Sequence, residues 1–260
     1  MTYHDQIGNT LHFKQSPKRI ISLVPSQSEF LWDLGLGADL IGITKFCVHP
    51  PEMFKSLARI GGTKELNLDK IRALAPELII GNKEENDALQ IATLQKEFNV
   101  WISDIVNFKG TYEMMQSLGK ILNREEAALK ITNDIHRSLD GIQNILPPLK
   151  VAYFIWNKPY MLAANSTFIH FVLTDLGLTN VVGQFERYPV FDEQQLKALN
   201  PDLCFLSSEP FPFNSQHAAV LQEILPNAKM IQVDGEMFSW YGTRLKYLAA
   251  YVDVLKHQLI

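Results

Sequence analysis

Cys47 and His49 are the most distinctive pair of potential metal ligands in this sequence. They are two positions apart in a short loop that ends at two prolines. A cysteine sulfur and an imidazole nitrogen can both coordinate iron, cobalt or zinc. A C-x-H pair supplies two ligands at most, so the alternative is a packed loop in which the histidine is hydrogen-bonded. We consider Cys47 and His49 as candidate metal ligands with that alternative open.

Other cysteine-based chemistry is limited by number. The only other cysteine is Cys204, which excludes a multi-disulfide scaffold and any four-cysteine zinc or iron–sulfur site within one chain. The sequence contains no G-x-S-x-G, P-loop, G-x-G-x-x-G or H-E-x-x-H motif, and no motif pairs any of its seven histidines with a nucleophile. These absences favour a binding protein over an enzyme.

A polar loop follows the first predicted strand. Ser26 and Gln27 come directly after Pro25, at the expected start of a helix. Free backbone N–H groups at such a helix start can bind a phosphate or carboxylate arm of a ligand. Alternatively, Ser26 and Glu29 form an S-x-x-E capping box, in which the serine caps its own helix.

Aromatic residues gather in two other loops that follow predicted strands. Phe238, Trp240 and Tyr241 lie in an acidic segment bounded by glycines, and exposing them would be costly unless they cover something apolar. Trp156 ends the predicted strand at 151–156, and Tyr160 follows that strand. We predict that all five contact a ligand, with ordinary packing as the alternative for both groups.

The elements that position these residues alternate between strand and helix. Apolar runs at 19–24 and 40–44 flank a helical segment, which makes a βαβ unit. The same rhythm continues through strands at 77–81 and 100–103 and resumes from 151 to 259. It breaks between 111 and 146, where apolar residues keep helical spacing without a clear strand, and residues 123–126 offer an alternative start for a second helix within this stretch.

The two halves also share short motifs in the same order. The motif D-L-G-L occurs at 33–36 and 175–178, and the sequence around L-A-P-E-L at 74–78 returns as L-N-P-D-L at 199–203. Helix ends at glycine and stops at proline are common, but two pairs in order favour a repeat. The sequence therefore predicts an α/β fold of two lobes, where small molecules commonly bind in the cleft between the lobes.

Composition and charge exclude several classes of function. The chain has 260 residues, a net charge of −4 and 47% hydrophobic residues. These values argue against binding nucleic acid or an anionic membrane by bulk charge. No apolar run is long enough to cross a bilayer, and the first nine residues lack a signal-peptide pattern.

The motifs in order resemble the substrate-binding proteins of metal-chelate ABC importers. The opening R-I-I-S-L-V-P-S-Q-S-E at 19–29 is similar to the family's first block, and the later blocks match at 34–43, 61–63, 67–71 and 74–80. The resemblance covers nearly the whole chain, and the vitamin-B12 branch is the most similar, with haem and ferric-siderophore binders as relatives.

The resemblance implies two Rossmann-like α/β lobes joined by a single long helix, with a ligand cleft between the lobes. We expect an N-terminal lobe at 1–110, the connecting helix at 111–147 and a C-terminal lobe at 148–260. The resemblance also implies that the Phe46 ring contacts the ligand and that Arg187 lies on a segment that covers the ligand. Acidic residues that dock a membrane permease would be Asp69 and, at a less regular position, Glu193. The alternative is that both acids only stabilise the first turn of a helix through its dipole.

We therefore predict the substrate-binding component of an ABC transporter, which captures a metal chelate and uses no covalent cofactor. The expected ligand is a corrinoid, then haem or a ferric siderophore, and the expected partner is an ABC permease. We expect a monomer that does not bind nucleic acid.

The resemblance implies a periplasmic or other extracytoplasmic location, whereas the missing leader leaves a cytoplasmic one open. The alternatives are a cytoplasmic chaperone of a metal or metal chelate, a chelatase-like enzyme, and a regulatory module that binds a protein partner.

Overall fold

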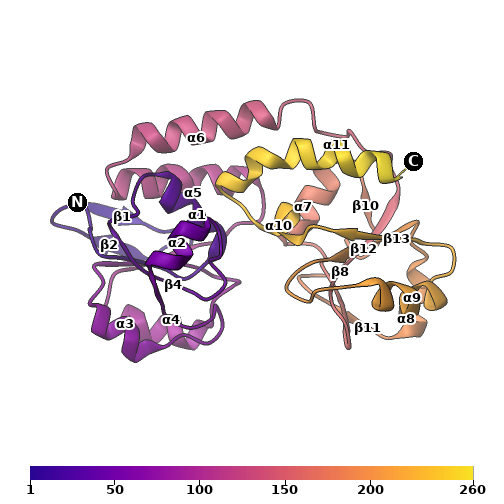
Figure 1. Ribbon diagram of the computed structural model, residues 1–260, viewed down its shortest axis with the longest axis horizontal. Coiled ribbons are helices and arrows are strands. Elements are labelled where there is room, and N and C mark those ends of the chain that lie inside the picture. Colours follow the sequence, from indigo (N-terminus) through magenta and orange to yellow (C-terminus); the bar gives the residue numbers. More distant parts are fainter. Residues whose placement is uncertain (260) are drawn as a thin grey trace. The chain divides into compact units, whose positions relative to one another are not determined.

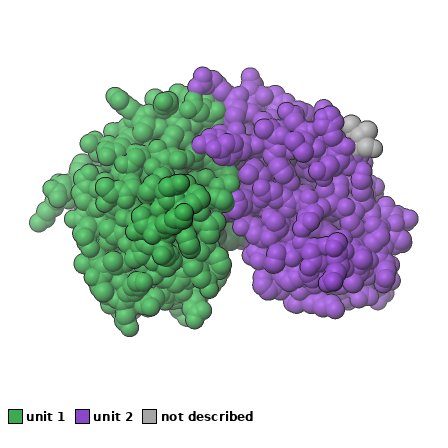
Figure 2. Space-filling view, viewed as in Figure 1, with its two compact units in different colours: residues 1–135, 241–244 green, residues 136–240, 245–260 purple. Residues whose placement is uncertain are grey.

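The computed structural model describes residues 1–259, which form two compact units (Figure 1). Unit 1 contains residues 1–135 and 241–244. Unit 2 contains residues 136–240 and the described residues from 245 onward, and Figure 2 colours the two units separately. The chain therefore passes from one unit to the other after Ile135, after Trp240 and after Arg244.

Unit 1 is built on a parallel five-stranded sheet with the order β5-β4-β3-β6-β7. Counted along the chain, these strands lie in the order third, second, first, fourth, fifth, which is Rossmann-like. Strands β3 and β6 are buried throughout, as expected for the centre of a parallel sheet. The strands are β3 (Ile20–Ser22), β4 (Leu40–Ile43), β5 (Ala58–Arg59), β6 (Leu78–Asn82) and β7 (Val100–Ser103).

Helices connect the strands of this sheet, and a separate hairpin begins the chain. The hairpin pairs β1 (Thr2–His4) with β2 (Thr10–His12) in antiparallel fashion. The helices are α1 (Pro25–Asp33), α2 (Pro51–Ser56), α3 (Leu68–Leu74), α4 (Ala88–Gln95), α5 (Phe108–Ile121) and α6 (Glu125–Ser138).

The start of α1 differs from the capping-box prediction. The helix begins at Pro25, and its N-cap is Val24, which makes no side-chain capping bond. Proline suits this first position because its fixed φ is already helical and the missing N–H would have no partner within the helix. Ser26 therefore lies inside the first turn, and the predicted capping box between Ser26 and Glu29 is wrong.

The segment expected to form one long connecting helix contains two helices. The chain leaves helical geometry between α5 and α6, where Asn123 adopts a φ of 54°. Both helices are amphipathic, and Gly119 allows their close approach, since a Cβ there would meet the Ala128 Cβ at 2.7 Å. The helical spacing along 111–146 therefore reflected two helices, of which α6 carries the chain from unit 1 into unit 2.

Unit 2 is built on a six-stranded mixed sheet. Its parallel part pairs β10 with β8, β8 with β12 and β12 with β13. Two short antiparallel strands extend this part. Strand β9 pairs with the last residues of β8, past the residues that pair with β10, and β11 pairs with β9. The strands are β8 (Lys150–Trp156), β9 (Tyr160–Leu162), β10 (Thr179–Asn180), β11 (Val190–Phe191), β12 (Leu203–Ser207) and β13 (Lys229–Val233).

The helices of unit 2 follow its strands in the pattern seen in unit 1. Those in the first part of the unit are α7 (Phe168–Asp175), α8 (Glu193–Leu199) and α9 (Ser215–Ile224). The remaining ones are α10 (Gly235–Ser239), the 3₁₀ helix η1 (Thr243–Tyr247), which begins in unit 1, and α11 (Leu248–Leu259). No helix among residues 1–259 is long and apolar enough to cross a bilayer.

The internal repeat is visible in the geometry of helix ends. Helices α3 and α8 have seven residues each, and both end at a left-handed residue before a proline. That residue is Ala75 in unit 1, with φ 44° and ψ 63°, and Asn200 in unit 2, with φ 43° and ψ 61°. Matching dihedral angles at matching positions support the repeat predicted from the sequence.

Candidate functional site

In open α/β sheets, ligands bind beyond the carboxyl ends of the strands, at the point where the strand order reverses. In unit 1 this point lies between β3 and β6, which pair along residues 20–22 and 78–80. In unit 2 it lies between β8 and β12, which pair along residues 151–154 and 203–206. The candidate ligand-binding residues are therefore the side chains at these two sheet edges, one in each unit.

The edge of unit 1 carries a buried polar cluster around Gln27. The Gln27 amide Nε2 donates to the Ser103 Oγ at 2.5 Å and to the Gly81 carbonyl at 3.2 Å. It also lies 3.5 Å from the Tyr241 hydroxyl, while its Oε1 is buried without a hydrogen-bond partner. Gln27 is therefore at the predicted edge, but its side chain is inside the unit.

Tyr241 joins this cluster from the other end of the chain. Its hydroxyl donates to Glu85 Oε1 at 3.1 Å, and Glu85 lies in the loop that follows β6. Burial raises the pKa of Tyr241 well above its usual value, and the negative charge of Glu85 acts in the same direction. The hydroxyl therefore stays protonated and acts as a hydrogen-bond donor. Ser26 is buried beside this cluster.

The two candidate metal ligands differ in burial, since Cys47 is buried and His49 is half-buried. The Cys47 Sγ is buried and lies 3.1 Å from both the Ser28 and the Thr44 hydroxyl oxygens. Burial raises the pKa of this thiol to about 11, so it is protonated at neutral pH and poorly suited to bind a metal. Among residues 1–259, no cluster of three or more His, Cys, Asp or Glu side chains could hold a metal ion. The buried, hydrogen-bonded sulfur therefore favours the packed-loop alternative for Cys47, and a metal-ligand role for His49 stays a prediction.

Phe46, in the same loop, is an exposed aromatic residue. Its ring is 48% exposed, and the Lys45 ammonium lies 5.2 Å from the ring centroid. Gly62 provides the space beneath the ring, since a Cβ there would lie 3.2 Å from the Phe46 Cε2 atom. Phe46 is thus a supported aromatic face on unit 1, as a ligand-stacking role requires.

Trp156 is the corresponding exposed aromatic residue of unit 2. It is the last residue of β8, and its side chain is 41% exposed. The register between β8 and β9 shifts at this point, so that Phe154 pairs with Leu162 and Trp156 with Met161. Such bulges redirect a side chain. Trp156 therefore lies at the switch-point edge of unit 2 with much of its ring accessible.

Two other predicted aromatics belong to the core of unit 2. Tyr160 packs against Phe154 with ring centroids 6.3 Å apart, and it belongs to the main hydrophobic cluster. Phe238 is fully buried, with its ring 5.3 Å from that of Tyr153. The expectation that these two residues contact a ligand is not supported, because the short strand β9 and helix α10 direct their rings inward.

Trp240 is also nearly buried, and its polar edge is bonded. Its indole Nε1 donates to the Glu209 carboxylate at 2.8 Å, and the Ser239 hydroxyl donates to the same oxygen at 2.9 Å. Burial raises the pKa of Glu209. Phe238 and Trp240 thus pack inside unit 2, which is the alternative left open by the sequence, whereas Tyr241 packs into the Gln27 cluster of unit 1.

Arg187 lies in the segment that leads to β11. Its backbone has a φ of 62° and bridges the neighbouring segment, with its N–H donating to the Asn165 carbonyl and its carbonyl accepting from the Ala164 N–H. The side chain is half-buried. The backbone of the segment predicted to cover the ligand is therefore well held at this residue.

The two candidate docking acids lie in equivalent first turns. Asp69 is the second residue of α3 and its side chain is 95% exposed, whereas Glu193 is the exposed first residue of α8. The Asp69 carboxylate accepts from the Arg72 guanidinium at 3.0 Å, and Arg72 also pairs with Glu97 at 2.8 Å. Hydrogen bonding from Arg72 lowers the pKa of Glu97.

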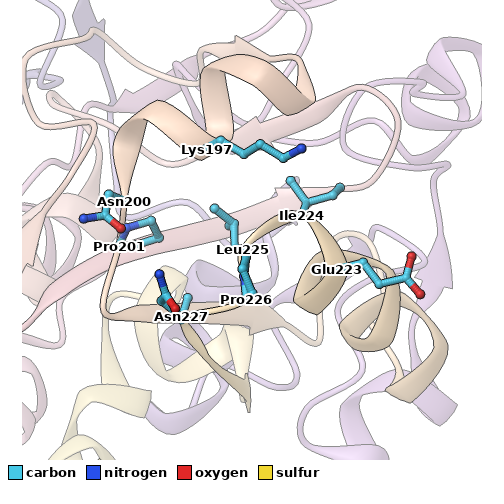
Figure 3. A pocket seen from close by; sticks show the side chains of 9 residues that line it. Lys197, Asn200, Pro201, Glu223, Ile224, Leu225, Pro226 and Asn227 are labelled. Carbon is cyan, nitrogen blue, oxygen red and sulfur yellow. The ribbon is translucent and has the colours of Figure 1, made fainter.

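Two surface hollows lie within single units. One, of about 610 Å³, lies in unit 1 and is lined by Lys45, Asp69 and Arg72 among other residues. The other, of about 350 Å³, lies in unit 2 and is lined by residues that directly precede β12 and β13, together with Lys197 (Figure 3). The second hollow therefore lies at the amino ends of those strands, away from the edge where ligands are expected.

Sequence reasoning missed several residues that the structure brings to these edges. Glu209 and Phe211 follow β12, and Glu29 forms an ion pair with Arg244, with both side chains 11% exposed. A sequence signal existed for the loop after β12, because aromatic and acidic residues come directly after a predicted strand there. The pairing of Glu29 with Arg244 spans 215 positions and has no local signal.

Comparisons with known proteins agree on one family. The sequence profile of the periplasmic binding protein family matches residues 20–230. A vitamin B12-binding protein of Vibrio vulnificus is 27% identical over 227 residues, which is 84% of this chain and 82% of the relative.

Solved structures share the fold. The periplasmic vitamin B12-binding protein of Vibrio cholerae has a TM-score of 0.74 at 21% identity, covering 92% of this chain and 98% of that chain. A periplasmic haem-binding protein of Pseudomonas aeruginosa has a TM-score of 0.76 at 22% identity, covering 93% of both chains. The α/β two-lobe fold predicted from the sequence is therefore confirmed.

Proposed function

The chain belongs to the periplasmic binding protein family, and we propose that it captures a metal chelate for an ABC importer. The family and its similar relatives are named as binding proteins and not as enzymes, so we take ligand capture as the function of this chain. The observation that carries the proposal is the exposed ring of Trp156 at the switch-point edge of unit 2. A supported, exposed aromatic face at this edge suits a flat apolar ligand.

We propose a corrinoid as the first ligand to test, with haem second and ferric siderophores third. Several curated relatives are named as vitamin B12-binding proteins. The charged residues at the edge of unit 1 support the same order of ligand preference. Glu84 and Glu85 lie in the loop after β6, whereas Lys83 pairs with Asp104 at 2.6 Å and Lys64 donates to the Glu84 carbonyl at 2.6 Å. An acidic edge disfavours ligands with several carboxylate or catecholate groups.

The ligand contacts that we propose come from each unit separately. In unit 1 the contact is the exposed Phe46 ring, and in unit 2 the contacts are Trp156 and Arg187. Ser26 and Gln27 are buried and belong to the interior of the unit 1 edge. Tyr241 and Trp240 are buried, and their polar atoms bond to Glu85 and Glu209, so neither is among the proposed contacts. No covalent cofactor enters this proposal.

An ABC permease is the partner that this function requires, and an extracytoplasmic location goes with it. Asp69 and Glu193 are the residues that we propose for docking, since both are exposed acids in the first turns of equivalent helices. Charge reversal at such exposed positions would change association more than folding.

A ligand titration tests the proposed function. Cyanocobalamin, cobinamide, haemin and a set of ferric siderophores would be titrated while tryptophan fluorescence and ligand absorbance are recorded, with free zinc and ferric ions as controls. We expect saturable binding of one chelate at micromolar or tighter dissociation constant. Binding of free metal alone, or of nothing in the panel, would contradict the proposal.

A further inference from the structure

Phe211 forms an aromatic corner with Trp156 in unit 2. Phe211 lies in the loop that follows β12, and Trp156 ends β8, so the two residues flank the strand-order reversal of this sheet. Their ring centroids are 5.6 Å apart and their planes meet at 62°. Trp156 is exposed and Phe211 is half-buried, so both residues present part of their surface at this edge.

The Phe211 ring is held in place by its neighbours. It packs edge-to-face on Phe213 with centroids 4.9 Å apart, and on His217 at the same distance. Phe213 is buried and anchors the corner to the core, where its ring lies 6.2 Å from that of Phe154. Rings fixed in this way lose little conformational entropy when a ligand binds.

The loop backbone is equally well fixed. The Phe213 N–H donates to the Ser207 carbonyl at 3.2 Å, and the Ser208 N–H donates to the Val233 carbonyl at 3.0 Å. The Gln232 amide donates to the Phe213 carbonyl. These bonds tie the loop to β12 and β13, so Phe211 has a defined position before any ligand arrives.

The adjacent histidine contributes a ring and not a metal bond. The His217 Nδ1 accepts the Asn214 N–H at 3.2 Å as part of the capping box of α9. The neutral ring therefore carries its proton on Nε2, which leaves no lone pair there for iron or cobalt. The corner can bind by ring contact but not by coordination through this atom.

We propose that Phe211 and Trp156 together form the aromatic contact for the ring system of a macrocyclic metal chelate, with Phe211 determining how tightly the ring is bound. This inference rests on the proposed function, which it deepens by adding a residue and by restricting the ligand to one with a flat macrocycle. A corrin or porphyrin ring offers the apolar face and edge that two angled rings can contact. A ferric siderophore, which lacks such a ring, would gain little from this corner.

The test compares four proteins in titrations with cyanocobalamin, haemin and ferric siderophores. The variants are Phe211→Ala, Phe211→Tyr, which keeps the ring, and Tyr247→Ala, which removes a ring of unit 2 that is 49% exposed. We expect Phe211→Ala to weaken macrocycle binding by about fivefold or more. Phe211→Tyr and Tyr247→Ala should stay within about twofold of wild type, within the range of neutral contacts.

Thermal unfolding checks that each variant folds, and Phe211→Leu replaces Phe211→Ala if the alanine variant is destabilised. A macrocycle affinity that is unchanged in Phe211→Ala, or reduced equally in Tyr247→Ala, would overturn the inference while leaving the proposed function intact. Wild type that binds only ferric siderophores would overturn the macrocycle assignment. Wild type that binds no chelate would remove the proposed function and this inference together.

Discussion

At the scale of single residues, burial decides what the chemically active side chains can do. Cys47 has the residue type and spacing of a metal ligand, but its sulfur is enclosed by hydroxyl groups inside unit 1. Tyr241 and Trp240 are aromatic residues in a loop, but each directs a polar atom to a carboxylate. Sequence gives residue type and spacing, whereas exposure depends on contacts that form only in the folded chain.

Both thiols should resist modification in the native protein. Burial raises the pKa of Cys47 to about 11 and that of Cys204 to about 12, so neither forms much thiolate at neutral pH. We expect a chromogenic disulfide reagent to label neither cysteine in the folded state and both after unfolding. Rapid labelling of one thiol in the native protein, assigned to Cys47 by a Cys204→Ser control, would restore Cys47 as an accessible ligand.

Glu209 should make stability depend on pH. Because burial raises the pKa of Glu209 in the folded state, its stabilising contribution is present in full below the unfolded value near 4.5. That contribution is lost as pH rises through the higher folded pKa. A Glu209→Gln variant can keep both hydrogen bonds, which converge on one oxygen, without the buried charge.

We therefore expect the free energy of unfolding of Glu209→Gln, relative to wild type, to increase between pH 4.5 and pH 7. Urea unfolding at several pH values measures this difference, with Glu223→Gln as the exposed control. A difference that does not change with pH would mean that the carboxylate of Glu209 is as well solvated in the folded state as in the unfolded state.

At the scale of elements, strands and helix ends were predictable where neighbouring residues in the sequence determine them. The strands at 20–22, 40–43, 78–82 and 100–103 and the stops before Pro76 and Pro201 follow from apolar runs and proline. Short elements such as β9 and β11 were missed, because two- and three-residue strands are defined by their partners in the sheet. The break near Asn123 was weakly signalled, since both flanking segments keep helical spacing.

The repeated helix end offers a matched pair of variants. Ala75 holds a left-handed conformation that an L-residue with a Cβ adopts at a cost of about 1 kcal/mol, and asparagine tolerates it better. We expect Ala75→Asn to raise the free energy of unfolding by about 0.5–1 kcal/mol, and Asn200→Ala to lower it by a similar amount. Denaturant titration measures both, and changes of the same sign in the two variants would contradict the equivalence of the two helix ends.

At the scale of the whole molecule, unit 1 is completed by residues from the far end of the sequence. The Arg244 guanidinium bonds both Glu29 oxygens, at 3.0 and 2.8 Å, and both side chains are nearly buried. The two-lobe architecture was predictable from the rhythm of elements and the repeat. The return of Tyr241–Arg244 to unit 1 was not, because it depends on a contact between residues far apart in sequence.

Loss of one partner of this ion pair should destabilise the protein. Arg244→Met leaves a buried carboxylate without its main partner, and we expect it to lower the free energy of unfolding by about 3–5 kcal/mol. The double variant Glu29→Gln, Arg244→Met removes the unpaired charge and should recover part of that loss. Equal destabilisation in the single and double variants would show that the charge of Glu29 is not the cause.

Under the proposed function, one chain captures one metal chelate. Equilibrium dialysis of the intact protein against cyanocobalamin, with haemin and a ferric siderophore in parallel cells, counts bound cobalt or iron per chain. We expect one of these chelates to saturate at one per chain, with a macrocycle preferred over the siderophore. Retention of all three at the level of a protein without a chelate site would contradict the proposed function.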